Sequence, residues 1–262
     1  KEELIEYLNE ELKRKNISEF NFKNIQQKFN IADLSSSGIN ACKDEYFSEN
    51  KQQFDFYLNL LKSKDNNYES LYTEFYPNNV LFLNFNYTNL PTKIIDNIQT
   101  DDIFNYKTGN KSHECIYIHG ELQNPQNPII FGYGDEQDED HKLIEKQGAD
   151  YLNNIKTINY LKTGNYKKLL SFIESDYYQV FTFGHSCGLS DKTLLNTLFE
   201  HKHCVSIKPF YYEWKDKKEI KHNNYDNIVK NIYRVFSNKT NMRDKVVPKT
   251  NCQPLAQNQL HE

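Results

Sequence analysis

Short apolar runs, each ending abruptly in polar or glycine residues, constrain the fold of this chain most strongly. One such run covers residues 80–83 and ends in Asn-Phe-Asn-Tyr-Thr, and similar runs recur at residues 115–118, 128–131 and 178–183. Unbroken apolar runs of this length are typical of strands that are buried on both faces, as in parallel sheets. We expect a further strand within residues 203–212, so the chain should build a sheet.

Amphipathic segments surround the predicted strands. Apolar residues at helical spacing predict helices at residues 2–14, 54–61, 143–173 with a break near 163–165, 194–199 and 224–236. Strands and helices therefore alternate from Asn79 onward. This alternation predicts an α/β fold with a Rossmann-like, doubly wound and mostly parallel sheet.

Three parts follow from this pattern, although they can together form a single domain. We expect a helical portion at residues 1–78 that packs on the main domain, the α/β domain at residues 79–236, and an irregular tail at residues 237–262. The chain opens at Lys1 on a helical pattern without an initiator methionine. We therefore expect the natural protein to begin further upstream.

Composition excludes several classes of protein. The 262 residues carry a net charge of -4, which gives no global footprint for nucleic acid, although a local basic groove remains compatible with it. The 5 cysteines are scattered and never form a CxxC pair, so we predict reduced thiols and no metal site. No stretch approaches the roughly 20 apolar residues of a membrane span, and the start lacks a signal-peptide block. These features predict a cytoplasmic protein.

The carboxyl ends of the predicted strands hold the candidate site, because ligands of open α/β sheets bind there. Asn86 can recognise a ribose or a carboxamide or orient a water molecule, but asparagine at a strand end also commonly caps a turn. His119 suits general acid–base work, or it is simply a satisfied histidine at the rim. The further residues that we expect around the ligand are Asn84, Thr88, Gly120, Gly132, Asp135, Gly184, His185, Ser186 and Asp191.

The segment from Gly184 to Gly188 allows two functional interpretations. Glycine at a strand-to-helix turn lets backbone N–H groups approach a phosphate, and the following helix N-terminus favours the anion. We expect Ser190 or Asp191 to cap that helix. The pattern Gly-His-Ser-Cys-Gly also fits a nucleophile elbow, in which Ser186 would act as the nucleophile of a hydrolase.

The order of these motifs resembles the AbiH family of bacteriophage abortive-infection proteins. The resemblance rests on Phe-Asn-Tyr-Thr at 85–88, Ile-His-Gly at 118–120, the segment at 129–136 and Phe-Gly-His-Ser at 183–186, and it covers residues 79–191. The same order is remotely similar to that of sirtuin-like NAD hydrolases. This similarity implies an anti-phage protein that binds NAD or a related nucleotide and cleaves the bond to nicotinamide.

The resemblance to sirtuin-like domains also implies roles for individual residues. It places Asn86 near the nicotinamide ribose, His119 as a base around the ribose hydroxyls, and Gly184 and Ser186 in the loop that contacts the nucleotide. Thr88 stands where sirtuins usually have aspartate, and the cysteine pairs of their zinc module are absent from the sequence. Protein deacylation is therefore not expected.

Alternative functions remain open because no glycine-bearing strand and turn precede Asn79 to hold a pyrophosphate. The second hypothesis is a non-catalytic module that senses a nucleotide, or that binds either a defence-complex partner or further copies of itself in a homo-oligomer. A third is a nuclease or a serine hydrolase that uses His119, Asp135 or Ser186.

Overall fold

The computed structural model describes residues 33–46, 48–49, 51–62, 79–89, 92, 112–133, 146 and 149–255. The helix predicted at residues 2–14 and the residue Asp135 lie outside this part of the chain. The helices are α2 (Ser36–Tyr46), α3 (Lys51–Lys62), α6 (Lys156–Tyr160), α7 (Asn165–Ser175), α8 (Lys192–Glu200), α9 (Tyr225–Val235) and α10 (Lys239–Lys245). The strands are β1 (Asn79–Asn84), β2 (Ser112–Tyr117), β3 (Tyr178–Thr182), β4 (Cys204–Pro209), β5 (Glu213–Lys215) and β6 (Lys221–Asn223).

Parallel pairing, as expected from the apolar runs, joins the strands of the body. β1 pairs with β2 and β3 pairs with β4, both in parallel, whereas β5 and β6 form an antiparallel hairpin. Among the described residues these are three separate two-stranded sheets. The α/β class is therefore confirmed, whereas a single doubly wound sheet is not seen.

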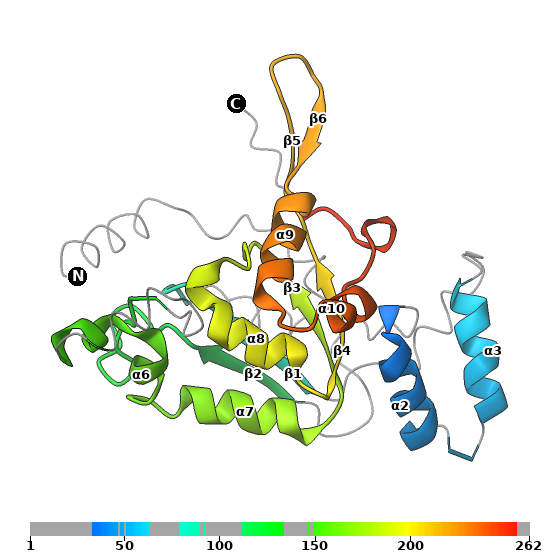
Figure 1. Ribbon diagram of the computed structural model, residues 1–262, viewed down its shortest axis with the longest axis horizontal. Helices are drawn as coiled ribbons and strands as arrows, with labels where there is room; N and C mark the ends of the chain where they lie inside the picture. Colours follow the sequence, from blue (N-terminus) through cyan, green and yellow to red (C-terminus); the bar gives the residue numbers. More distant parts are fainter. Residues whose placement is uncertain are drawn as a thin grey trace.

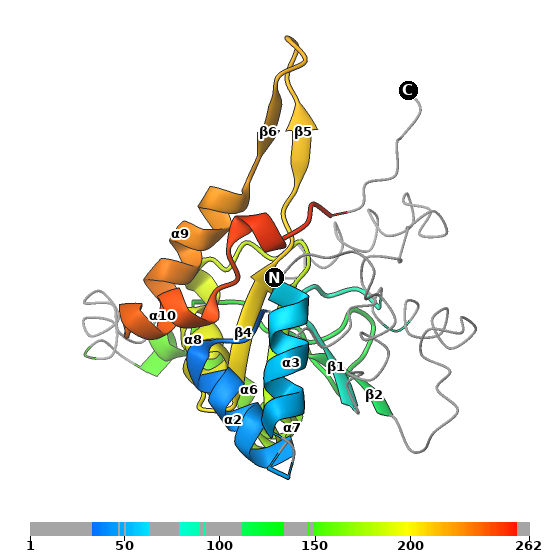
Figure 2. The ribbon, with the colours of Figure 1, turned by 90° about the vertical axis from the view of Figure 1, so that its right-hand side faces the viewer.

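Helices cover both sides of β4. In Figures 1 and 2, α8, α9 and α10 lie on one side of the strands, while α2 lies beside β4 and α3 packs against α2. Every residue of β4 is buried, including Ser206 and Lys208. Tyr178 pairs with Cys204 but Gln179 pairs with Ser206, which leaves Val205 in a bulge. Val205 packs in the smaller core with residues of α2 and α3.

Apolar spacing explains how the helices dock. In α9, Ile228, Ile232 and Val235 recur along one face and are all buried in the main core. α7 contributes Leu169 and Ile173 to the same core in the same way. The break predicted near residues 163–165 is confirmed, since α7 begins at Asn165.

Two sequence predictions are wrong. The run at residues 128–131 forms no strand, because Pro128 has no N–H to donate and the N–H of Ile130 bonds to a loop carbonyl, that of His119. The run is instead an extended segment whose Ile129 and Ile130 are buried. The tail predicted as irregular contains α10, whose Met242 belongs to the main core.

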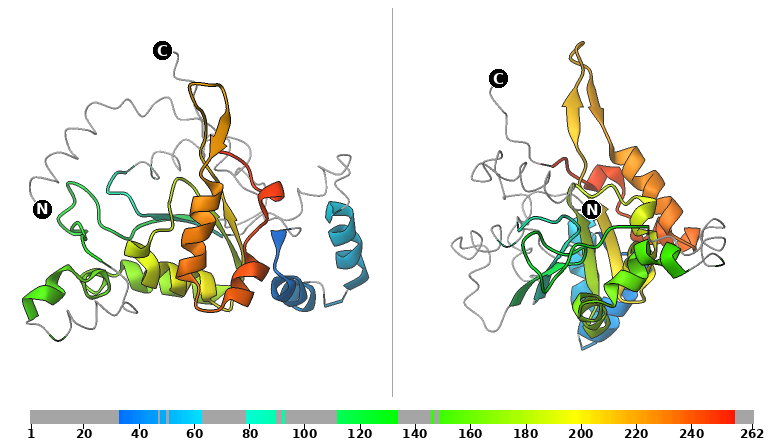
Figure 3. Two further views of the ribbon diagram at one scale, coloured as in Figure 1. Left: turned by 45° about the horizontal axis from the view of Figure 1, so that its top comes forward. Right: turned by 90° about the vertical axis from the view of Figure 1, so that its left-hand side faces the viewer.

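The β5–β6 hairpin stands apart from the body. It projects beyond the helices in every view (Figures 1, 2 and 3). Its base is fixed to the start of α9, because the side chain of Asn224 accepts a hydrogen bond from the backbone N–H of Tyr212 at 2.7 Å.

Candidate functional site

Three strand ends converge on one carboxylate. Phe85 follows β1, His119 follows β2 and His185 follows β3, and the Phe85 ring lies between the two imidazoles, with centroid distances of 5.3 and 4.2 Å. Both histidines face Asp191, which precedes α8. Three of the strand-end motifs that the sequence predicts to meet therefore do so, although the two parallel pairs share no ladder among the described residues. The fourth motif, from Gly132 to Asp135, follows a run that forms no strand and ends outside the described residues.

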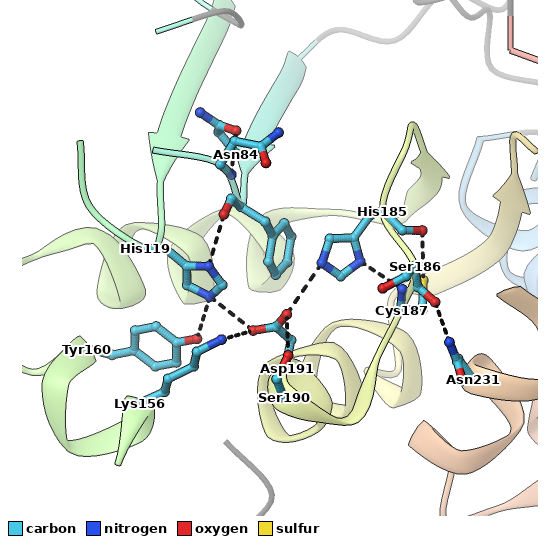
Figure 4. A network of polar contacts seen from close by, with 12 residues as sticks. Asn84, His119, Lys156, Tyr160, His185, Ser186, Cys187, Ser190, Asp191 and Asn231 are labelled. Carbon is cyan, nitrogen blue, oxygen red and sulfur yellow. Dashed lines mark hydrogen bonds and ion pairs between the residues drawn. The ribbon is translucent and has the colours of Figure 1, made fainter. Parts of the chain in front are cut away.

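Asp191 is the centre of a cluster that we define as His119, Lys156, Tyr160, His185 and Asp191. Its Oδ1 lies 2.6 Å from Nζ of Lys156 and 3.1 Å from Nε2 of His119, and its Oδ2 lies 3.5 Å from Nε2 of His185. Figure 4 shows these groups approaching the carboxylate from different sides. All but His185 are more than nine-tenths buried. The Asp191 cluster is thus a nearly dry charged network.

The network keeps Asp191 ionised. Burial alone would raise its pKa, but hydrogen bonds from His119 and His185, the charge of His119 and the hydrogen bond from Lys156 outweigh burial and hold the pKa of Asp191 well below its usual range. Burial, reinforced by the negative charge of Asp191, raises the pKa of Tyr160 far above that of a free tyrosine. Tyr160 is therefore a neutral hydrogen-bonding group here.

Hydrogen-bond partners fix the proton on each ring. The N–H of Cys187 donates to Nδ1 of His185 at 3.1 Å, so the proton of a neutral His185 sits on Nε2, toward Asp191. Nδ1 of His119 lies 3.0 Å from the carbonyl oxygen of Phe85 and must donate to it. Nε2 of His119 meets both Asp191 and, at 3.2 Å, the hydroxyl of Tyr160. It donates to the carboxylate when protonated and accepts from the hydroxyl when not.

The residues after β1 divide into a buried support and an exposed tip. Asn84 is buried, and its side chain closes the turn by donating to the carbonyl of Thr88 at 2.8 Å and accepting from the N–H of Asn86 at 2.9 Å. This is the capping role typical of asparagine, but it belongs to Asn84 rather than to Asn86. Asn86 is exposed beside the rim, so its side chain faces solvent.

The predicted glycines differ in what they do. At Gly120, with φ of 84°, a side chain would come within 2.3 Å of the carbonyl oxygen of Pro128, and at Gly132 within 1.7 Å of that of Asn154. These two glycines are needed for close packing of loops. Gly184 also has a positive φ, 69°, but open space surrounds the position of a side chain. Only Gly184 leaves room beside the backbone for a ligand.

The geometry around Ser186 disfavours a nucleophile elbow. Ser186 is exposed, and its Oγ contacts no imidazole among the described residues, because both nitrogens of His185 are engaged elsewhere. The strained residue of the turn is Cys187, with φ of 54°, rather than the serine. Burial and the charge of Asp191 also raise the pKa of the Cys187 thiol to about 12, so it is no ready nucleophile.

The role of Asp191 differs from the predicted cap, and two partners were missed. The side chain of Asp191 makes no capping hydrogen bond to α8, because it turns into the cluster. Lys156 and Tyr160 lie four residues apart on one face of α6, where Lys156 contacts Asp191 and Tyr160 contacts Nε2 of His119. Their spacing is visible in the sequence, but nothing there distinguishes them from a surface lysine and a core tyrosine. Among the described residues, no group of histidine, cysteine or acidic side chains could hold a metal ion.

The fold and the site define an α/β protein in which parallel strand ends surround a buried histidine–aspartate–lysine network. The family model described as bacteriophage abortive infection AbiH matches residues 1–213, which include every candidate site residue. The chain therefore belongs to the AbiH family of phage abortive-infection proteins. No curated protein and no solved structure gives a significant match. No helix within the described part is long and apolar enough to cross a membrane.

Proposed function

We propose that this AbiH protein acts in bacterial phage defence by binding NAD or a related nucleotide at the strand ends around the Asp191 cluster. The supporting observation is the meeting of Phe85, His119 and His185, which follow three different strands, at one carboxylate. Carboxyl ends of parallel strands are where α/β proteins bind ligands. The proposal includes a Rossmann-like, sirtuin-like architecture for the domain that carries this site.

In the leading form of the proposal, the protein hydrolyses NAD. The bond between C1′ of the ribose and the nicotinamide nitrogen breaks, its electron pair leaves with nicotinamide, and water adds to the oxocarbenium centre with release of one proton. Asn86, exposed beside the rim, orients the water or the ribose. His119 takes a ribose or water proton through Nε2, which requires that this nitrogen leave Asp191 and Tyr160. The backbone at Gly184 and Ser186 contacts phosphate.

The second form is a nucleotide-sensing module without turnover, and the engagement of His119 favours it. The imidazole is 4% exposed, and both of its nitrogens already face protein groups. Such a ring can hold the rim in shape for a ligand without taking part in proton transfer. Ligand recognition then depends on the exposed Asn86 and Gly184, and a partner supplies the toxic activity.

Incubation of the full chain with NAD separates these forms. ADP-ribose and nicotinamide are measured by chromatography, and NAD binding is measured by calorimetry, with and without lysate of phage-infected cells as the trigger. Asn86→Ala, which alters an exposed side chain, is compared with Asn40→Ala on α2, also exposed. Product that is lost in N86A and kept in N40A supports the glycohydrolase. Binding without product, again lost in N86A, supports the module, and absence of both binding and product refutes the proposal.

A further inference from the structure

The projecting hairpin of β5 and β6 carries a surface that the Asp191 cluster does not use. The family match ends at residue 213, where this hairpin begins. Trp214 and His222 are directly opposite each other across the two strands. The hairpin thus extends away from the body of the molecule (Figure 3).

Aromatic rings form a row on the hairpin. The rings of Tyr212 and Trp214 are 5.7 Å apart and inclined by 20°, and those of Trp214 and His222 are 5.8 Å apart and inclined by 25°. Tyr212 is 47% exposed and Trp214 is 40% exposed. Large aromatic rings usually bury most of their surface. A row of nearly parallel rings that stays exposed therefore indicates a binding site, and its flat faces suit a ligand with flat groups.

The charge that remains available on the hairpin is positive. Asp216 accepts two backbone N–H groups of the turn and pairs with the histidine of β6, while Glu219 pairs with the lysine of β5. Both acidic groups of the turn are therefore occupied. Lys217, Lys218 and Lys221 are exposed, and within the described part of the chain they have no ion-pair partner.

We propose that the β5–β6 hairpin binds single-stranded nucleic acid, with unpaired bases stacked on Tyr212 and Trp214 and phosphates held by Lys217 and Lys218 of the turn. Rings that accept any base and ammonium groups that follow the phosphates are the combination that single strands require. A protein partner would use the rings but has no general need for the unpaired lysines of the turn. A duplex would offer phosphates but no free base faces. The proposal is independent of nucleotide binding at the Asp191 cluster.

The tryptophan itself provides the assay, because Trp214 is the only tryptophan in the chain. We expect a 15-nucleotide oligo(dT) or oligo(U) to quench the fluorescence of the full chain saturably at low salt. Contacts from two lysines give a slope of log binding constant against log salt of about -1.4, at about 0.7 for each phosphate of a single strand. A duplex of equal length should bind at least tenfold more weakly.

Variants assign the binding to the hairpin. In anisotropy titrations with a labelled oligonucleotide, Trp214→Ala and the double variant Lys217→Glu/Lys218→Glu should each weaken binding about tenfold or more. The matched control, Lys167→Glu/Lys168→Glu, reverses two adjacent exposed lysines of α7 and should leave binding unchanged. Circular dichroism checks that every variant is folded.

Four results would overturn the proposal. These are the absence of binding to either single strand, binding that the hairpin variants leave intact, equal or tighter binding of the duplex, and equal weakening by the α7 control. Capture of a protein that is lost in W214A, with no binding of nucleic acid, would assign the hairpin to a protein interface instead.

Discussion

The substitution Asp191→Asn tests the central role of this carboxylate most directly. Asparagine offers one oxygen acceptor and one N–H₂ donor where the carboxylate accepts hydrogen bonds on both oxygens. The N–H₂ group of the asparagine must therefore face another donor, either Lys156 or His185, to which it cannot form a hydrogen bond. The side chain of Lys156 is 8% exposed, so its ammonium would lose its counter-charge in a nearly dry environment. Breaking a buried pair in this way costs about 3–5 kcal/mol.

Urea unfolding followed by circular dichroism measures the effect. For a chain of this size the loss corresponds to a fall in Tm of roughly 6–20 °C. The double variant Asp191→Asn/Lys156→Met should lose about 2 kcal/mol less free energy of unfolding than the two single variants lose in sum, because it leaves no unpaired buried charge. The control Asp226→Asn removes an exposed carboxylate of α9 and should change the free energy of unfolding by less than about 1 kcal/mol. A D191N value no larger than that of the control would refute the reasoning.

Acid provides a second test of the same carboxylate. Because the folded state holds the pKa of Asp191 well below its unfolded value, its stabilisation is present above about pH 4 and is lost as pH falls toward the folded pKa. The difference in free energy of unfolding between the original chain and D191N should therefore shrink as pH falls below about 4. A difference that stays constant from pH 7 to pH 3 would contradict this assignment.

Three further changes are tested by the free energy of unfolding in urea. Gly120→Ala should cost more than about 2 kcal/mol, because the new methyl group would clash with the backbone of Pro128. Gly184→Ala should cost only the roughly 1–2 kcal/mol of a left-handed backbone, because open space surrounds that position. Equal losses would contradict this difference in the space around the two glycines. Thr182→Val should be neutral or stabilise by about 1 kcal/mol, since the buried hydroxyl has no hydrogen-bond partner within the described residues, and a clear loss would reveal one. Lys245→Met should cost about 1–3 kcal/mol, because the ammonium donates to two carbonyls at the end of α8, at 3.0 and 2.8 Å; an unchanged stability would mean that water replaces it.

The sequence allows the strand ends to be predicted because burial and chain direction both leave marks in it. Apolar runs indicate the four parallel strands, and polar residues after them indicate that His119 and His185 share an edge. The run at residues 128–131 fails because an extended loop that buries isoleucines has the same composition as a strand. Hydrogen bonding, rather than hydrophobicity, separates the two.

The composition of the cluster itself could not be predicted. Lys156 reaches Asp191 across 35 residues of chain, and that contact depends on how α6 docks rather than on any local pattern. Asp191 was expected beside the ligand and as a possible helix cap. Its side chain makes no cap, because the buried cations compete more strongly for the carboxylate than the backbone N–H groups of α8 do.

Helix α9 connects two surfaces that have been described separately. It starts at the base of the hairpin, where Asn224 is bonded to Tyr212, and the side chain of Asn231 farther along donates to the carbonyl of Ser186 at 2.8 Å. Its 11 residues form a rod about 16 Å long. The hairpin and the loop after β3 are therefore both held by one helix, α9, through hydrogen bonds of Asn224 and Asn231.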